Sequence, residues 1–171
     1  MSPREQLDAV SARLGAHFAT IAATYESIRR ELQLHSDGKS LKGDEIVGWI
    51  GEVYAKLLLG GTIVSDSFEH DVEAGGRCIS VKARKGWKSG WTQTSAIPKI
   101  QGTNCPSHLL FVHLNDDFTV DRMWLYPWSD MVALNRFKVH MVRGSPRSFI
   151  FYVNPSADTR YVVYPEIAGP D

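Results

Sequence analysis

The first third of the chain repeats apolar residues at a spacing typical of helices. Two rows recur every seven residues, namely Leu7, Leu14, Ile21, Ile28 and Phe18, Tyr25, Leu32. This period predicts a long amphipathic N-terminal helix that begins at the capping pattern Ser2-Pro3-Arg4-Glu5 and ends near His35. Ser11 interrupts the second row, which favours a helix packed on its own domain and leaves a coiled-coil homodimer as the alternative. We assign residues 1–36 to this helix and residues 37–171 to the main domain.

A second helix is predicted from Asp44, its N-cap, to Leu59, where Gly60-Gly61 ends it. Helical spacing gives this helix a core face made of Ile46, Ile50, Val53 and Leu57. Glu52 belongs to a neighbouring, more polar stripe. Its carboxylate can pair with Lys56 four residues later or point toward the strands that follow, and the pattern leaves both open.

Beyond the second helix, apolar and polar residues alternate with the period of strands. The pattern predicts strands over residues 62–68, 70–74, 77–84, 107–114, 118–126, 148–154 and 160–167. Strands 70–74 and 77–84 form a hairpin around Gly75-Gly76, and the last two strands form another. Short helices are expected near the end of the 87–102 loop and over 129–134. These elements predict an α/β domain with a mixed central sheet flanked by helices.

The hairpin around Gly75-Gly76 brings an acid and a lysine onto one face. If Ile79 and Val81 enter the core, Ser80 and Lys82 face the other way, and Asp71 lies on that same outer face. A carboxylate next to an ammonium group on one strand face suits a site that holds a metal ion and a phosphate. The alternative is an ordinary amphipathic hairpin in which Lys82 only pairs with Asp71.

The charges are segregated along the chain, although 19 Lys and Arg balance 19 Asp and Glu. Residues 42–73 hold seven acids and two bases, whereas residues 74–115 hold six bases and no acid. An acidic segment beside a basic, aromatic one favours metal-dependent chemistry on nucleic acid over a chance arrangement of surface charges. We expect nucleic-acid contacts at Arg84, Lys85, Trp87, Lys88, Trp91 and Gln93.

Several classes of protein are disfavoured by the sequence. It contains no apolar run long enough to cross a membrane and no secretory leader, so we expect a cytoplasmic protein. Cys78 and Cys105 are too few for a disulfide framework or a four-thiolate zinc site. Phosphate-binding loops, dinucleotide-binding glycine patterns and nucleophile-elbow motifs are also missing.

Residues 44–115 resemble the PD-(D/E)xK nuclease superfamily, which has the restriction-endonuclease-like fold. The resemblance lies in Glu52 on a helix, Asp71 at the start of a hairpin, and Ser80-Val81-Lys82 in the next strand. It implies that Asp71 binds a divalent metal, Mg²⁺ or Mn²⁺, and that Lys82 orients or activates the attacking water. It also implies that Glu52 completes the metal shell.

Two positions depart from the family pattern. His70 replaces the proline, and Ser80 replaces the second acid, although a hydroxyl is a poorer ligand for a hard cation than a carboxylate. Because no Asp or Glu occurs between Glu73 and Asp116, the missing carboxylate must come from elsewhere. Glu52 and Glu73 are the candidates, and we favour Glu52.

The sequence therefore predicts a metal-dependent nuclease that hydrolyses phosphodiester bonds in DNA, in restriction or defence. Its expected catalytic residues are Asp71, Lys82 and Glu52, and its expected metal ligands are drawn from Asp71, Glu52 and Glu73. The alternative is an inactive module of the same fold that binds nucleic acid or protein, with Ser80 as the trace of lost metal binding.

Overall fold

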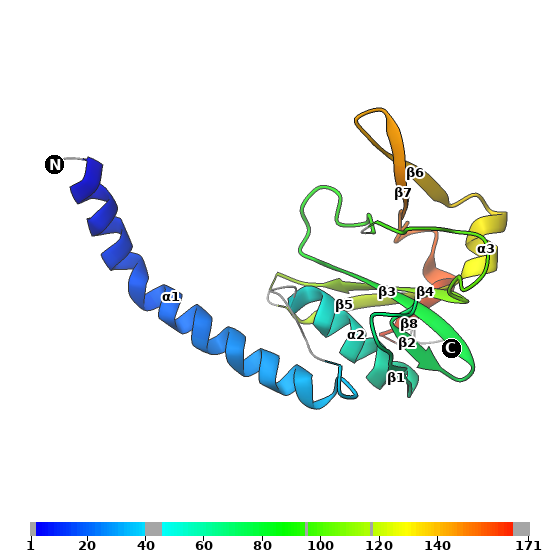
Figure 1. The fold of residues 1–171 in the computed structure, drawn as a ribbon, viewed down its shortest axis with the longest axis horizontal. Helices are drawn as coiled ribbons and strands as arrows, with labels where there is room; N and C mark the ends of the chain where they lie inside the picture. Colours follow the sequence, from blue (N-terminus) through cyan, green and yellow to red (C-terminus); the bar gives the residue numbers. More distant parts are fainter. Residues whose placement is uncertain (1–2, 40–45, 95, 117, 166–171) are drawn as a thin grey trace. The chain divides into compact units, whose positions relative to one another are not determined.

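The computed structural model describes residues 3–39, 46–94, 96–116 and 118–165, and the chain divides into two compact units at residue 41. The first unit is helix α1 (Pro3–Leu34) with the turn that follows it (Figure 1). This turn is tied to the helix end, because the Gln33 side chain donates a 2.7 Å hydrogen bond to the Lys39 carbonyl. Asp37 and Gly38 then adopt left-handed backbone angles, with φ of 53° and 83°. Dimerisation through this helix stays a prediction.

The second unit is built on a six-stranded sheet. In spatial order its strands are β1 (Thr62–Ile63), β2 (Val72–Ala74), β3 (Arg77–Lys85), β4 (His108–Leu114), β5 (Val120–Pro127) and β8 (Val162–Tyr164). The central strands β3 and β4 are parallel, and every other neighbouring pair is antiparallel. The expected α/β domain with a mixed sheet is therefore confirmed.

The hairpin between β2 and β3 has the predicted turn. Gly75 and Gly76 have φ of 56° and 74°, which is the left-handed geometry of a two-residue type I′ turn. As expected, Val72, Ile79 and Val81 are buried. This register fixes which side chains of β3 enter the core and which face the site.

Helix α2 (Ile46–Leu59) packs against β3 at close range. A Cβ added at Gly51 would lie 2.8 Å from the Ala83 Cβ, so only glycine lets the helix approach this near. The predicted core position Leu57 is wrong, since its side chain is 54% exposed. Trp49 and Ala55 are buried instead, because the glycine face of the helix lies on the sheet. The predicted N-cap Asp44 lies outside the described residues.

Three other predicted elements need correction. The strand expected over 62–68 is limited to Thr62–Ile63, because Ser65 begins a turn in which its carbonyl accepts a hydrogen bond from the Phe68 amide. The described part of the 87–102 segment contains no helix. Gln93 and Ile97 there form isolated β-bridges to Tyr152 and Phe149.

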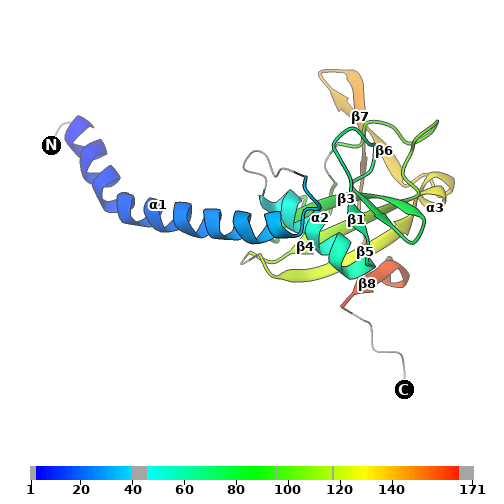
Figure 2. The same ribbon diagram turned by 60° about the horizontal axis from the view of Figure 1, so that its bottom comes forward.

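The expected pairing of residues 148–154 with 160–167 is also wrong. Strand β7 (Ser145–Phe151) pairs with β6 (Phe137–Val142), whereas β8 pairs with β5 at the edge of the main sheet. We call β6, β7 and their Arg143-Gly144 turn the arm, because this ribbon projects from the sheet in both views (Figure 1, Figure 2). The short helix α3 (Trp128–Ala133) was predicted and precedes the arm.

An aromatic core joins the main sheet to the base of the arm. Phe111, Trp124 and Tyr126 from β4 and β5 pack with Phe137 and Phe151 from β6 and β7.

Among the described residues, none of the helices combines the length and the apolar character needed to cross a bilayer.

Asp158 is a charged group inside this core, with only 2% of its surface exposed. Its carboxylate accepts hydrogen bonds from both Arg136 Nη atoms at 2.9 and 3.0 Å and from the Tyr126 hydroxyl at 3.0 Å. Burial acts to raise the pKa of Asp158, but the hydrogen bonds from Arg136, the Asn154 amide and Tyr126 outweigh it and hold that pKa below its usual value. The charged carboxylate is therefore the stable form in the fold.

Replacing Asp158 with alanine is expected to lower the free energy of unfolding at pH 7 by about 3 kcal/mol, because the partly buried Arg136 loses its counterion. Since the folded pKa lies below the unfolded one, the Asp158 contribution is complete above about pH 4. It declines below that pH and is lost as the pH falls through the folded pKa. Urea unfolding at pH 7 and at pH 3 tests this. The exposed Asp130→Ala is the control, and an Asp158→Ala protein as stable as that control would contradict the assignment.

Candidate active site

Asp71 is the residue just before β2, and hydrogen bonds hold it against the neighbouring strand β3. Its amide donates a 2.9 Å hydrogen bond to the Ile79 carbonyl. Its Oδ2 accepts a 2.7 Å hydrogen bond from the Val81 amide and lies 3.5 Å from the Ser80 hydroxyl. Its Oδ1 accepts no hydrogen bond from the described residues. One carboxylate oxygen thus fixes the side chain, and the other is left for a ligand.

Lys82 lies at the centre of the sheet, on β3 and in register with Phe111 of β4. Its side chain is half-buried. Within the described part of the chain, its ammonium makes no hydrogen bond or ion pair. A half-buried cation without a partner is unfavourable, so this group is suited to an anion or a water molecule that enters the site.

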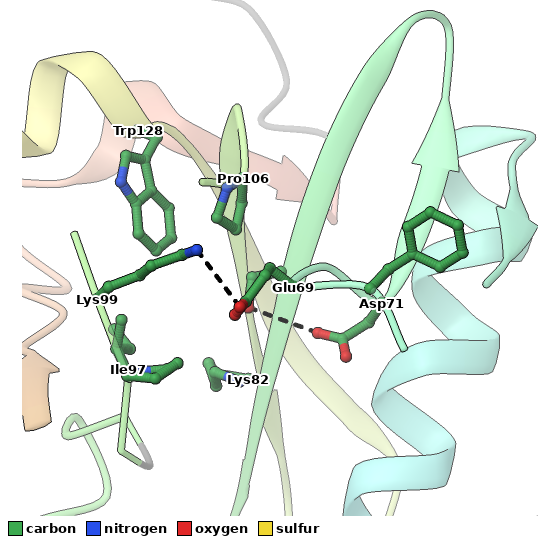
Figure 3. A pocket seen from close by; sticks show the side chains of 10 residues that line it. Glu69, Asp71, Lys82, Ile97, Lys99, Pro106 and Trp128 are labelled. Atoms are coloured by element: carbon green, nitrogen blue, oxygen red, sulfur yellow. Dashed lines mark hydrogen bonds and ion pairs between the residues drawn. The ribbon is translucent and has the colours of Figure 1, made fainter. Parts of the chain in front are cut away.

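Asp71 and Lys82 together line two clefts. The first, which we call the Glu69 cleft, has a volume of about 190 Å³ and also contains Ser80, Pro98 and Lys99. Figure 3 shows Glu69 joined to Lys99, and the two charged groups are 3.3 Å apart. The sequence patterns do not single out Glu69. The acid-rich composition of residues 62–73 is the available signal, but alternation predicts a strand over residues 62–68, where the structure has the turn that precedes Glu69.

The second cleft, which we call the Glu52 cleft, brings together the three expected catalytic residues. Glu52 from α2 lines it with Asp71 and Lys82, and Arg84 and Lys85 continue the same wall. Gly51, the residue before Glu52 in α2, lies against Ala83 and Val81 of β3, which sets the spacing between this helix and the strand that carries Lys82. The arrangement combines two carboxylates with cations, as a site for a metal ion and a phosphate requires.

Glu73 is placed elsewhere. It lines neither of the two clefts described above, and its carboxylate is 3.0 Å from His70 Nε2. With Cys78 these two residues hold one nitrogen, one oxygen and one sulfur atom within 4.8 Å of one another. This mixed donor set is typical of zinc, whereas Mg²⁺ prefers oxygen ligands alone.

The surroundings of Ser80 are also unlike those of a metal ligand. It is buried, and its hydroxyl is directed to Asp71 Oδ2 at 3.5 Å. A hydroxyl at this position can support the Asp71 charge as a weak donor, whereas an acid there would repel it.

The basic residues beside the site are partly engaged by the backbone. Arg84 Nε donates to the Gln93 carbonyl at 2.8 Å, and Lys85 Nζ donates to the Asp116 carbonyl at 3.0 Å. Lys88 is exposed. The guanidinium of Arg84 and the ammonium of Lys85 each keep further N–H groups. The Arg84 hydrogen bond therefore orders the 86–94 loop and leaves the cation able to bind another group.

Two of the expected contacts, Trp87 and Trp91, lie around the fully buried His113. The Trp91 ring stacks on the imidazole at 4.1 Å, and the Trp87 ring meets it edge-on at 4.5 Å. His113 Nδ1 lies 3.0 Å from Asp121 Oδ2, and its Nε2 lies 3.0 Å from the Gly86 carbonyl. Trp87 remains 54% exposed.

No protein-family model matches this sequence, and a search of curated proteins gives no match.

His113 is expected to hold the 86–94 loop in place. Replacing it with leucine removes both hydrogen bonds and leaves the Gly86 carbonyl without its partner, which should cost about 1–3 kcal/mol of stability. Amide hydrogen exchange over residues 86–93 should become faster in this variant. The exposed His17→Leu is the control, and unchanged exchange in His113→Leu would show that the loop is held by other contacts.

Proposed function

We propose that this protein is a metal-dependent nuclease that hydrolyses phosphodiester bonds in DNA. The observation that carries the proposal is that Glu52, Asp71 and Lys82 line one cleft. The second support is the resemblance of the same residues to the PD-(D/E)xK superfamily. Helix α2, the β2–β3 hairpin and the parallel strand β4 are consistent with a restriction-endonuclease-like domain. A role in restriction or defence against foreign DNA is part of this proposal.

The residues of the Glu52 cleft fit Mg²⁺ or Mn²⁺. Asp71 offers its Oδ1, which accepts no hydrogen bond from the described residues, and Glu52 supplies a second carboxylate in the same cleft. Oxygen ligands of this kind are those that hard divalent cations prefer. When bound, the metal would lower the pKa of a water ligand and neutralise charge that develops on the phosphate.

The remaining chemistry falls to groups already fixed in the fold. The Val81 amide holds Asp71 in one position at 2.7 Å, so its carboxylate does not need to reorganise. The unpaired ammonium of Lys82 can donate to the attacking water or to a phosphate oxygen. Glu69 offers a further carboxylate in the Glu69 cleft. Its negative charge is compensated there by the ion pair with Lys99.

Lys82 is the residue whose loss should abolish cleavage. Lys82→Met is expected to lower the rate of plasmid cleavage in Mg²⁺ about 10²- to 10⁴-fold, as the loss of a positioned proton donor or a charge-stabilising group does. Arg160→Gln removes an exposed cation outside the site and should retain the activity within a few-fold. The assay follows supercoiled plasmid and single-stranded DNA with Mg²⁺ and then Mn²⁺.

Equal cleavage by wild type and Lys82→Met would assign the activity to a contaminant. A wild-type protein that binds DNA but does not cleave it with either metal would favour the inactive module, with Ser80 as the reason.

Metal binding separates the candidate acids without relying on activity. Asp71→Asn keeps an oxygen for the Val81 amide but loses the charge, so Mn²⁺ affinity measured by calorimetry should fall about tenfold or more. Glu52→Gln should weaken binding as well. Glu73→Gln should leave it unchanged, because Glu73 lines neither cleft. If Glu69→Gln weakens Mn²⁺ binding and Glu52→Gln does not, the second ligand comes from the Glu69 cleft.

A further inference from the structure

The arm belongs to a second long segment without acidic residues. Residues 131–157 contain four Lys or Arg and no Asp or Glu. Together with residues 74–115 they hold ten of the 19 Lys and Arg in the chain. A surface built from these segments favours a polyanion as its partner.

The fold joins these two segments, although they are distant in the sequence. The Ile97 amide donates to the Phe149 carbonyl at 2.7 Å, and the Phe149 amide donates back to Ile97 at the same distance. Thr94 and Phe151 add a further backbone hydrogen bond of 2.9 Å. The arm is therefore anchored on the loop that leads from the strand of Lys82 to the Glu69 cleft.

The tip of the arm places a cation in an unfavourable backbone conformation. Arg143 and Gly144 form the two-residue turn with φ of 50° and 80°, a geometry that favours Asn, Asp or Gly at the first position. Arg143 is exposed and makes no hydrogen bond or ion pair within the described residues. An arginine is thus held where asparagine would fit the turn better.

A second exposed arginine, Arg147, lies at an irregularity in the strand pairing of the arm. His140 pairs with Ser148 and Met141 pairs with Pro146, so Arg147 is the extra residue of a β-bulge. Arg147 also has no partner among the described residues. Beside these cations, Val139 and Met141 leave about half of their surfaces exposed, at 52% and 51%. The arm therefore offers both cations for phosphates and apolar groups for base edges.

We propose that the arm is a duplex-DNA-binding element that enters the major groove. A two-stranded ribbon fits the major groove of B-form DNA, whereas the deep, narrow major groove of an RNA duplex excludes it. Arg143 and Arg147 contact phosphates or guanine edges, and Val139 and Met141 contact thymine methyl groups. This inference rests on the proposed nuclease function and names double-stranded DNA as its substrate.

One short segment, around Pro98, lies between the arm and the candidate active site. Pro98 lines the Glu69 cleft, and it also lines a groove at the arm with His140 and Arg147. A duplex seated along the arm would thus lie next to the cleft that holds Lys99 and Lys82. The arm would then position the backbone for the site.

The test measures binding by fluorescence anisotropy with the full-length protein in EDTA, where metal-dependent cleavage is excluded. The probes are a short DNA duplex, one of its strands, and an RNA duplex of the same sequence. Arg143→Asn, which suits the turn, and Arg147→Gln should each weaken duplex DNA binding about three- to tenfold and lower its salt slope by about one. Arg160→Gln removes an exposed arginine of the 3₁₀ helix Thr159–Tyr161 and should bind as wild type.

Wild-type binding by both arm variants would overturn the arm proposal, while plasmid cleavage would still support the nuclease. Arm-dependent duplex binding by a protein that cleaves nothing would keep the arm proposal and remove the nuclease. Equal affinity for the RNA duplex or for the single strand would overturn groove binding, as would a wild-type protein that binds none of the probes. Circular dichroism melts confirm that both variants are folded.

Discussion

The close contact between Gly51 of α2 and Ala83 of β3 is the constraint on which the site depends. A side chain at Gly51 would meet the Ala83 Cβ at 2.8 Å, so the helix lies on the strand only because this residue is glycine. Glu52 is the next residue in the helix, and Lys82 is the residue before Ala83. Any shift of α2 would therefore move Glu52 relative to the strand that carries Lys82 and fixes Asp71.

The strand β3 then serves both the core and the site. Its Val81 side chain is buried against α2, its Val81 amide fixes Asp71, and its Lys82 ammonium faces the clefts. A carboxylate that is hydrogen-bonded to a central strand is held without the entropic freedom of a loop, which is what a preorganised site requires.

Much of this arrangement follows from local patterns. The hairpin around Gly75-Gly76, the strands β4 and β5, and the grouping of Asp71 with Lys82 follow from period-two alternation and from glycine at the turn. The buried face of α2 was predicted less well, because periodicity does not reveal that Gly51 is the point of closest approach. Periodicity therefore predicts Leu57 in the core, whereas the structure exposes Leu57 and buries Trp49.

Long-range pairing is the part that local patterns do not determine. Alternation marks 148–154 as a strand, but its partner is chosen by the whole core, and the partner strand β6 is not among the predicted strands. Glu69 was missed for a similar reason. Its position in the cleft depends on Lys99, which a loop 30 residues later brings across the site.

The two clefts that share Asp71 and Lys82 suggest that the metal and the phosphate enter the proposed nuclease from different sides. The Glu69 cleft opens beside Pro98 and the arm, so a duplex held by the arm approaches from that side. The Glu52 cleft lies against α2 and contains the carboxylates of Glu52 and Asp71. Metal bound on the α2 side and phosphate entering from the Pro98 side would meet at Lys82, which lines both. In that arrangement Ser80 does not need to be an acid, because the second carboxylate comes from the helix and the serine hydroxyl supports the charge of Asp71.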